Sequence, residues 1–215
     1  MTIGKPRGER RLQHEGGARD MRSGGVKRNT SETKINLNLT LDSQEASSIA
    51  TGLPFLDHML YQIAKHGRMQ LRIDVQGDLE VDCHHTAEDV GMAFGMALKE
   101  ALGDKAGIRR FADRIVPMDE VLALCAIDLS GRAYLSYDAV YPSPMLGTLA
   151  VESVREFFKG LADKAGMCLH FKILTPGNTH HMVEAQFKAF ALTLRDAVAV
   201  QEGDASVPST KGMLD

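Results

Sequence analysis

The sequence predicts an α+β fold made of two similar halves, most simply an internally duplicated two-layer sheet-and-helix subunit with a pseudo-twofold axis. The phrase His-His-x-x-Glu occurs at residues 84–88 and again at 180–184, each time at the start of an apolar helical run. At the same offset of 96 residues, four later positions also coincide: Ala93/Ala189, Phe94/Phe190, Leu98/Leu194 and Ala101/Ala197. Each half further reads as strands, helix, strand, helix. These observations indicate an internal duplication.

In the first half, apolar and polar residues alternate over 27–41, which predicts a half-buried strand. Gly52-Leu53-Pro54 leads into a helix, and Gly103 ends the apolar helix that the first motif begins. The expected elements are a strand over 27–41, a polar loop over 43–51, a helix over 55–65, strands over 69–75 and 79–81, and a helix over 84–102.

In the second half, two apolar runs separated by Leu129-Ser130-Gly131 predict a hairpin of strands 121–128 and 132–140. A helix over 148–164, a strand over 167–174 and a helix over 180–200 should follow. The predicted organisation is a leader over 1–26, a first half over 27–115, a second half over 116–203 and a phosphate-binding tail over 204–215.

Composition separates the leader from the rest of the chain. Residues 1–30 hold eight Lys/Arg against three Asp/Glu, so their charge of +5 leaves −8 for residues 31–215. The basic leader is expected to be disordered, and the acidic body argues against nucleic-acid binding. No apolar run approaches the roughly 18 residues of a membrane span. Three scattered cysteines fit a reducing, cytoplasmic setting, with Cys83 as a packing residue.

The spacing of the repeated motif suits metal binding. Residues three and four apart share a helix face, so Glu88 can meet either His84 or His85. The two adjacent imidazoles diverge by about 100°, which would strain both to reach one ion. We therefore expect each motif to serve two metals, with one imidazole for each.

The duplication also indicates where further ligands lie. Residues 55–73 overlay 153–171 at an offset of 98, which places His58 on Glu156. Both side chains are donors, and adding them leaves positions open for water or substrate, as a catalytic site requires. The predicted metal ligands are His58, His84, His85, Glu88, Glu156, His180, His181 and Glu184.

Other residues suit an anion. The phrase Ser209-Thr210-Lys211-Gly212 offers hydroxyls, an ammonium and backbone N–H groups for phosphate oxygens, and Arg110, Arg132 and Lys188 could contribute charge. From the residues alone, a two-metal phosphatase or other hydrolase and a metal-storage protein remain alternatives. The His-rich shell, with no obvious bridging Asp, favours a nitrogen heterocycle as the ligand.

Five phrases in order resemble the imidazoleglycerol-phosphate dehydratase family: residues 52–60 (GLPFLDHML), 84–89 (HHTAED), 128–132 (DLSGR), 180–189 (HHMVEAQFKA) and 208–212 (PSTKG). The resemblance covers residue 27 to the end. It implies a duplicated α+β subunit, two Mn²⁺ per active site and an assembly of 24 subunits. It also implies dehydration of imidazole glycerol phosphate to imidazole acetol phosphate in histidine biosynthesis.

The resemblance assigns roles residue by residue. His58, His84, His85, Glu88, His180, His181 and Glu184 match its metal ligands, whereas the position of Glu156 is His in many members. Whether Glu156 ligates directly stays open. Glu32 matches an acidic residue that approaches the substrate, and Glu32 and Glu184 are the expected carriers of protons. Gln62 lies in the substrate-facing helix, and the expected phosphate contacts are Arg110, Arg132, Lys188, Ser209 and Lys211.

Overall fold

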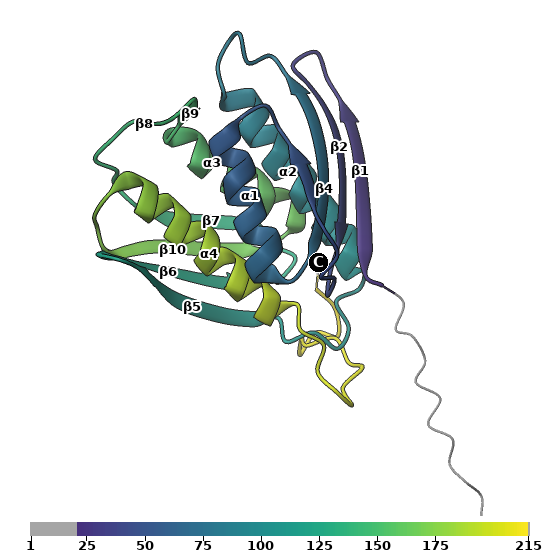
Figure 1. The fold of residues 1–215 in the computed structure, drawn as a ribbon. Helices are drawn as coiled ribbons and strands as arrows, with labels where there is room; N and C mark the ends of the chain where they lie inside the picture. Colours follow the sequence, from purple (N-terminus) through teal and green to yellow (C-terminus); the bar gives the residue numbers. More distant parts are fainter. Residues whose placement is uncertain (1–20, 215) are drawn as a thin grey trace, which may run out of the picture.

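In this computed structural model, which describes residues 21–214, four helices lie between two four-stranded sheets (Figure 1). The first half contains β1 (Ser23–Asn29), β2 (Thr33–Thr40), β3 (Ser48–Ala50), α1 (Pro54–Gly67), β4 (Gln70–Gly77) and α2 (His84–Leu102). The second contains β5 (Phe111–Met118), β6 (Val121–Asp128), β7 (Tyr134–Asp138), α3 (Glu152–Ala165), β10 (Cys168–Thr175) and α4 (Thr179–Ala197), with β8 (Met145–Leu146) and β9 (Leu149–Ala150) as a small ribbon. The predicted α+β class is confirmed.

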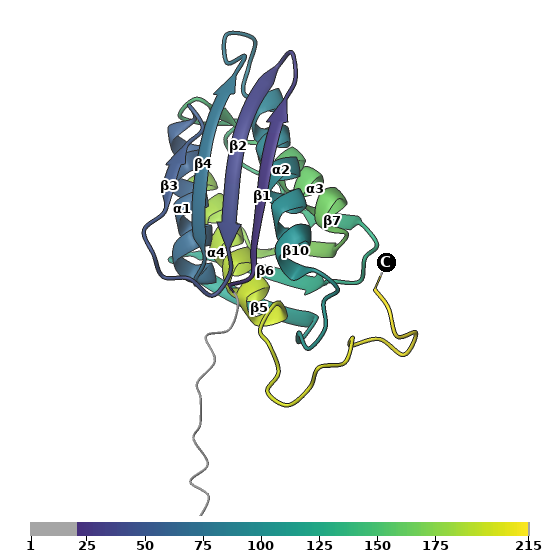
Figure 2. The ribbon, with the colours of Figure 1, turned by 90° about the vertical axis from the view of Figure 1, so that its right-hand side faces the viewer.

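The two sheets have the same topology, which confirms the duplication. Their strand orders are β1-β2-β4-β3 and β5-β6-β10-β7. In each, the first three strands pair antiparallel and the last pairs parallel. Figure 2 shows the first sheet with β3, β4, β2 and β1 side by side.

The helices pack across the two halves of the duplication. Helix α1 of the first half contacts α4 of the second, and α2 contacts α3. The α2–α3 approach is close enough that a Cβ on Gly91 would lie 2.1 Å from the carbonyl oxygen of Phe157. This crossed packing brings the two His-His-x-x-Glu helices against helices of the opposite half. No described helix is long and apolar enough to cross a bilayer.

Several sequence predictions fail at chain reversals in the first half. The predicted strand over 27–41 is a hairpin of β1 and β2, closed by a hydrogen bond from Thr30 N to Thr33 O (2.8 Å). The polar loop over 43–51 contains β3, and residues 79–81 form a turn instead of a strand. Residues 23–26 of the predicted disordered leader belong to β1, while residues 1–20 lie outside the described range.

The predicted hairpin of 121–128 and 132–140 is wrong. Strand β6 pairs with β5 and β10, whereas β7 pairs parallel with β10. Gly131, with a φ of 88°, turns the chain beneath the end of α3, where its N–H donates to Gly166 O (2.8 Å). Strand β5 was missed because Pro117 interrupts a weak alternation, which an edge strand tolerates. The expected boundary at 115/116 falls inside β5.

Candidate active site

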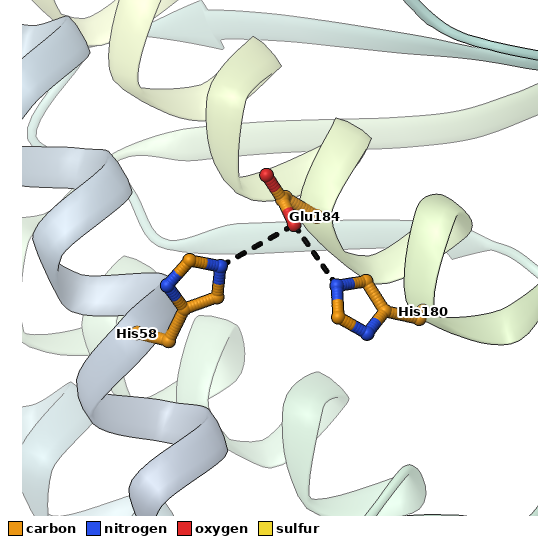
Figure 3. A group of neighbouring side chains, drawn as sticks. All are labelled: His58, His180 and Glu184. Atoms are coloured by element: carbon orange, nitrogen blue, oxygen red, sulfur yellow. Dashed lines mark hydrogen bonds and ion pairs between the residues drawn. The ribbon is translucent and has the colours of Figure 1, made fainter.

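His58, His180 and Glu184 form a compact cluster of donor groups, called here the His58 cluster (Figure 3). His58 comes from α1, and the other two come from the first turns of α4. Glu184 Oε2 lies 3.1 Å from His180 Nε2 and 3.4 Å from His58 Nε2. One ligand atom from each residue lies within 4.8 Å of the others. Imidazole and carboxylate donors at this separation suit a divalent transition metal.

The carboxylate of Glu184 is buried but well compensated. Burial raises its pKa, whereas the hydrogen bond and charge of Lys188 and the hydrogen bond of His180 lower it, and the net direction is down. Lys188 Nζ lies 2.7 Å from Glu184 Oε1. Behind the cluster, Gln62 Nε2 lies 3.5 Å from His58 Nε2, and Gln62 Oε1 lies 3.1 Å from His66 Nε2. Glu184 is therefore an ionised donor that Lys188 holds in place.

The second histidine of each motif makes a different set of contacts from the first. His181 Nδ1 lies 2.9 Å from Glu120 Oε2, and His181 Nε2 lies 3.8 Å from Asp119. His85 Nδ1 lies 2.9 Å from Asp78 Oδ2, and His85 Nε2 lies 3.9 Å from Glu32. The predicted divergence of adjacent imidazoles is present in both motifs, whose ring centroids are 6.1 Å apart.

The carboxylates beside these two histidines raise the histidine pKa values. The hydrogen bond from Asn178 N, followed by that of His181, lowers the pKa of Glu120 to about 2. The hydrogen bond to Glu120 raises the pKa of His181, and the hydrogen bond to Asp78 raises that of His85.

The remaining predicted ligands do not form a comparable group within the described chain. No trio of donor atoms within 4.8 Å includes His84, Glu88 or Glu156 among the residues described. Glu156 is instead paired with Arg155 (2.7 Å) and Lys159 (3.7 Å). These three residues lie on α2 and α3, the helix pair that is pseudo-equivalent to α4 and α1. The pseudo-symmetry is thus present in the helices, but His84, Glu88 and Glu156 do not converge as His180, Glu184 and His58 do.

Four of the five predicted phosphate contacts line one groove of about 730 Å³: Arg110, Arg132, Ser209 and Lys211. Arg110 is fixed by Asp128, whose Oδ1 accepts from Nε (2.7 Å), and by the carbonyl of Pro208 (2.8 Å). Arg132 is exposed, and its guanidinium makes no hydrogen bond to the residues that the structure describes. Lys188, the fifth, lies beside the His58 cluster, where its Nζ contacts Glu184. Arg110 thus holds the tail in place, and Arg132 offers a guanidinium that no carboxylate of residues 21–214 pairs with.

Sequence reasoning missed the carboxylates Asp78, Asp119 and Glu120. Glu32 and Glu120 occupy equivalent places, each just before the second strand of its sheet, but they are 88 residues apart. That offset differs from the 96 and 98 of the helical repeats because the loops differ in length. An overlay of the two hairpin turns would have found Asp119 and Glu120, but not Asp78, which directly follows β4.

The fold and the His58 cluster define a class of protein: a duplicated α+β enzyme subunit with a group of histidine and carboxylate side chains that could hold a metal ion. A separate groove is lined by arginine and lysine side chains. A profile of the imidazoleglycerol-phosphate dehydratase family matches residues 51–194. The chain belongs to this family, and it is therefore a hydro-lyase of histidine biosynthesis with a small imidazole substrate.

Relatives and solved structures agree with this assignment. The imidazoleglycerol-phosphate dehydratases of Streptococcus mutans serotype c and Listeria welshimeri serovar 6b are 53% and 51% identical over 194 residues, or 90% of this chain and 100% of each relative. The crystal structure of the Staphylococcus aureus N315 enzyme aligns with a TM-score of 0.76 at 37% identity, over 83% of this chain and 99% of that one. The Pyrococcus furiosus enzyme, in complex with (S)-C348, aligns with a TM-score of 0.77 at 36% identity, over 88% and 100%.

Proposed function

We propose that the enzyme catalyses metal-dependent dehydration of D-erythro-imidazole glycerol phosphate to imidazole acetol phosphate and water. Each active site would use two Mn²⁺ ions, with other divalent transition metals as substitutes. The observation that carries this proposal is the His58 cluster, in which two imidazoles and a buried carboxylate converge. Three free cysteines are consistent with a reducing, cytoplasmic setting.

The donor set fits such ions. Two imidazoles and one carboxylate leave coordination positions open, and imidazole suits manganese, iron, cobalt, nickel and zinc. In each motif the two rings lie 6.1 Å apart and a carboxylate contacts Nδ1 of the second histidine, so we infer that the Nε2 atoms of His85 and His181 serve a metal shared with a second copy of the chain. If the two histidines of each motif serve different metal ions, the sites would be completed between copies of the chain, as in a homo-oligomer of 24 subunits.

The protein's own residues have separable tasks in the reaction. When bound, such cations stabilise the deprotonated imidazole ring of the substrate. The reaction removes hydroxide from C3 with electrons lent by the ring. Loss of the C2 proton returns an electron pair to the ring and leaves an enol, which tautomerises to the ketone of imidazole acetol phosphate. Glu32 is a better candidate than Glu184 for carrying the proton. The carboxylate of Glu184 is held by Lys188 and His180, whereas that of Glu32 lies 3.9 Å from His85 Nε2 and is freer to move. Arg132, Ser209 and Lys211 would bind the phosphate and fix the pose.

Product formation from imidazole glycerol phosphate tests this proposal. The purified protein should lose activity on chelation, regain it with added Mn²⁺, and dissociate from its assembly if the metals bridge subunits. Full turnover and an unchanged particle after metal removal would reject the metal dependence.

A matched pair of variants tests whether the metal binds at the His58 cluster. His58→Gln removes a member of the cluster, whereas His66→Gln changes a histidine two turns further along α1. Only the first should weaken Mn²⁺ binding strongly. Equal losses in both would mean that α1 as a whole, and not the cluster, governs binding.

A further inference from the structure

We propose that Asp78 and Glu120 are positioning residues: each binds Nδ1 of one histidine, His85 or His181, and so keeps its Nε2 free for a divalent cation. This inference rests on the metal dependence proposed above. The carboxylates occupy different places in the two halves, yet each lies 2.9 Å from the same ring atom of the second histidine of a motif.

Glu120 is itself held rigidly. Its Oε1 accepts a hydrogen bond from the backbone N–H of Asn178 (2.6 Å), while Oε2 faces His181. The Asn178 side chain in turn accepts from the backbone N–H of His180 (2.8 Å) and His181 (3.4 Å) at the start of α4. Gly177 makes room for this arrangement, because a Cβ there would lie 2.3 Å from Glu120 Oε1. The start of α4 and the β5–β6 turn therefore fix one imidazole together.

Asp78 has a simpler environment. Its Oδ2 contacts His85, while its Oδ1 is buried without a hydrogen-bond partner among the described residues. Within residues 21–214, His85 is the one side chain that contacts the Asp78 carboxylate by a hydrogen bond. An asparagine could keep an oxygen toward His85 and place its amide where Oδ1 now lies.

The physical consequence is a fixed tautomer. A carboxylate accepts only from a protonated nitrogen, so Nδ1 carries the hydrogen, and in the neutral ring Nε2 then presents its lone pair to a cation. A carboxylate behind a ligating histidine also raises its basicity, and loss of such a partner typically weakens metal affinity. Each Nε2 further faces a second acidic side chain, Glu32 or Asp119, which adds negative potential where a cation would bind.

The test measures Mn²⁺ affinity of the full-length protein by competition with a chelator. Asp78→Ala and Glu120→Ala should each weaken binding by about 10- to 100-fold. Gly177→Ala should weaken it too, because the new methyl displaces Glu120 while every donor stays in the chain. Asp138→Ala removes a carboxylate paired with Lys172 elsewhere and should leave the affinity at the wild-type value.

The variant Asp78→Asn distinguishes a residue that orients His85 from one that binds the metal directly. A carboxamide oxygen still accepts from Nδ1 but is a poor metal ligand, so most of the affinity lost in Asp78→Ala should return. Wild-type affinity in both alanine variants, or no recovery in Asp78→Asn, would overturn the inference while leaving metal dependence intact. A wild-type protein that binds no Mn²⁺ would overturn both.

Discussion

The close contact between α2 and α3 gives a sharp test of how the two halves are joined. Replacing Gly91 with alanine would place its Cβ 2.1 Å from Phe157 O, 2.8 Å from its carbonyl carbon and 3.0 Å from its Cα. All three atoms belong to the backbone of α3, so no rotamer change can relieve the clash. The two helices would have to separate.

The sign of the effect can be estimated because two terms oppose each other. Alanine in a helix interior is favoured over glycine by about 1 kcal/mol. Overpacking costs about 1–3 kcal/mol, and an obstacle made of backbone belongs at the upper end, at about 3 kcal/mol. We expect Gly91→Ala to lower the free energy of unfolding by about 2 kcal/mol, as the difference between these terms.

Denaturant unfolding followed by circular dichroism measures this difference. Gly67→Ala is the matched control, because a Cβ there meets Met69 Cε at 2.6 Å, the mobile end of a flexible side chain. That variant should be at least as stable as wild type, by up to about 1 kcal/mol, because the helix-propensity gain is then opposed only by a flexible side chain. A Gly91→Ala protein as stable as wild type, or more stable, would refute the close backbone approach.

Two further predictions concern substrate binding and pH. Arg132→Ala should raise KM about tenfold or more with little change in kcat, since a hydrogen bond to a charged group is worth about 1.5–3 kcal/mol; steady-state kinetics with an unaltered KM would exclude it from phosphate binding. Burial, followed by Lys188, lowers the pKa of His66 below its usual 6.5. The folded state therefore resists protonation of His66, so wild type should lose more stability than His66→Gln as pH falls below about 6.5. The free energy of unfolding of both proteins is measured from pH 8 to pH 5, and an equal loss in the two would contradict this prediction.

Local sequence patterns determined the helices and the kind of chemistry. The helix over 84–102 has the predicted ends, and the divergence of His84 from His85 follows from the helical repeat alone. The repeated motif predicted the duplication because each copy sits on an element of the same length. Family phrases then indicated the reaction.

Only the tertiary structure decided which elements meet. Strand pairing depends on contacts between distant segments, so the parallel pairing of β7 with β10 and the crossing of helices between halves could not be read from periodicity. The same limit hid Asp78 and Glu120, which lie at turns of unequal spacing. The spacing of side chains on a helix face is a local property, so the sequence shows it directly. The partners of His85 and His181 come from distant segments and depend on how the chain folds back on itself.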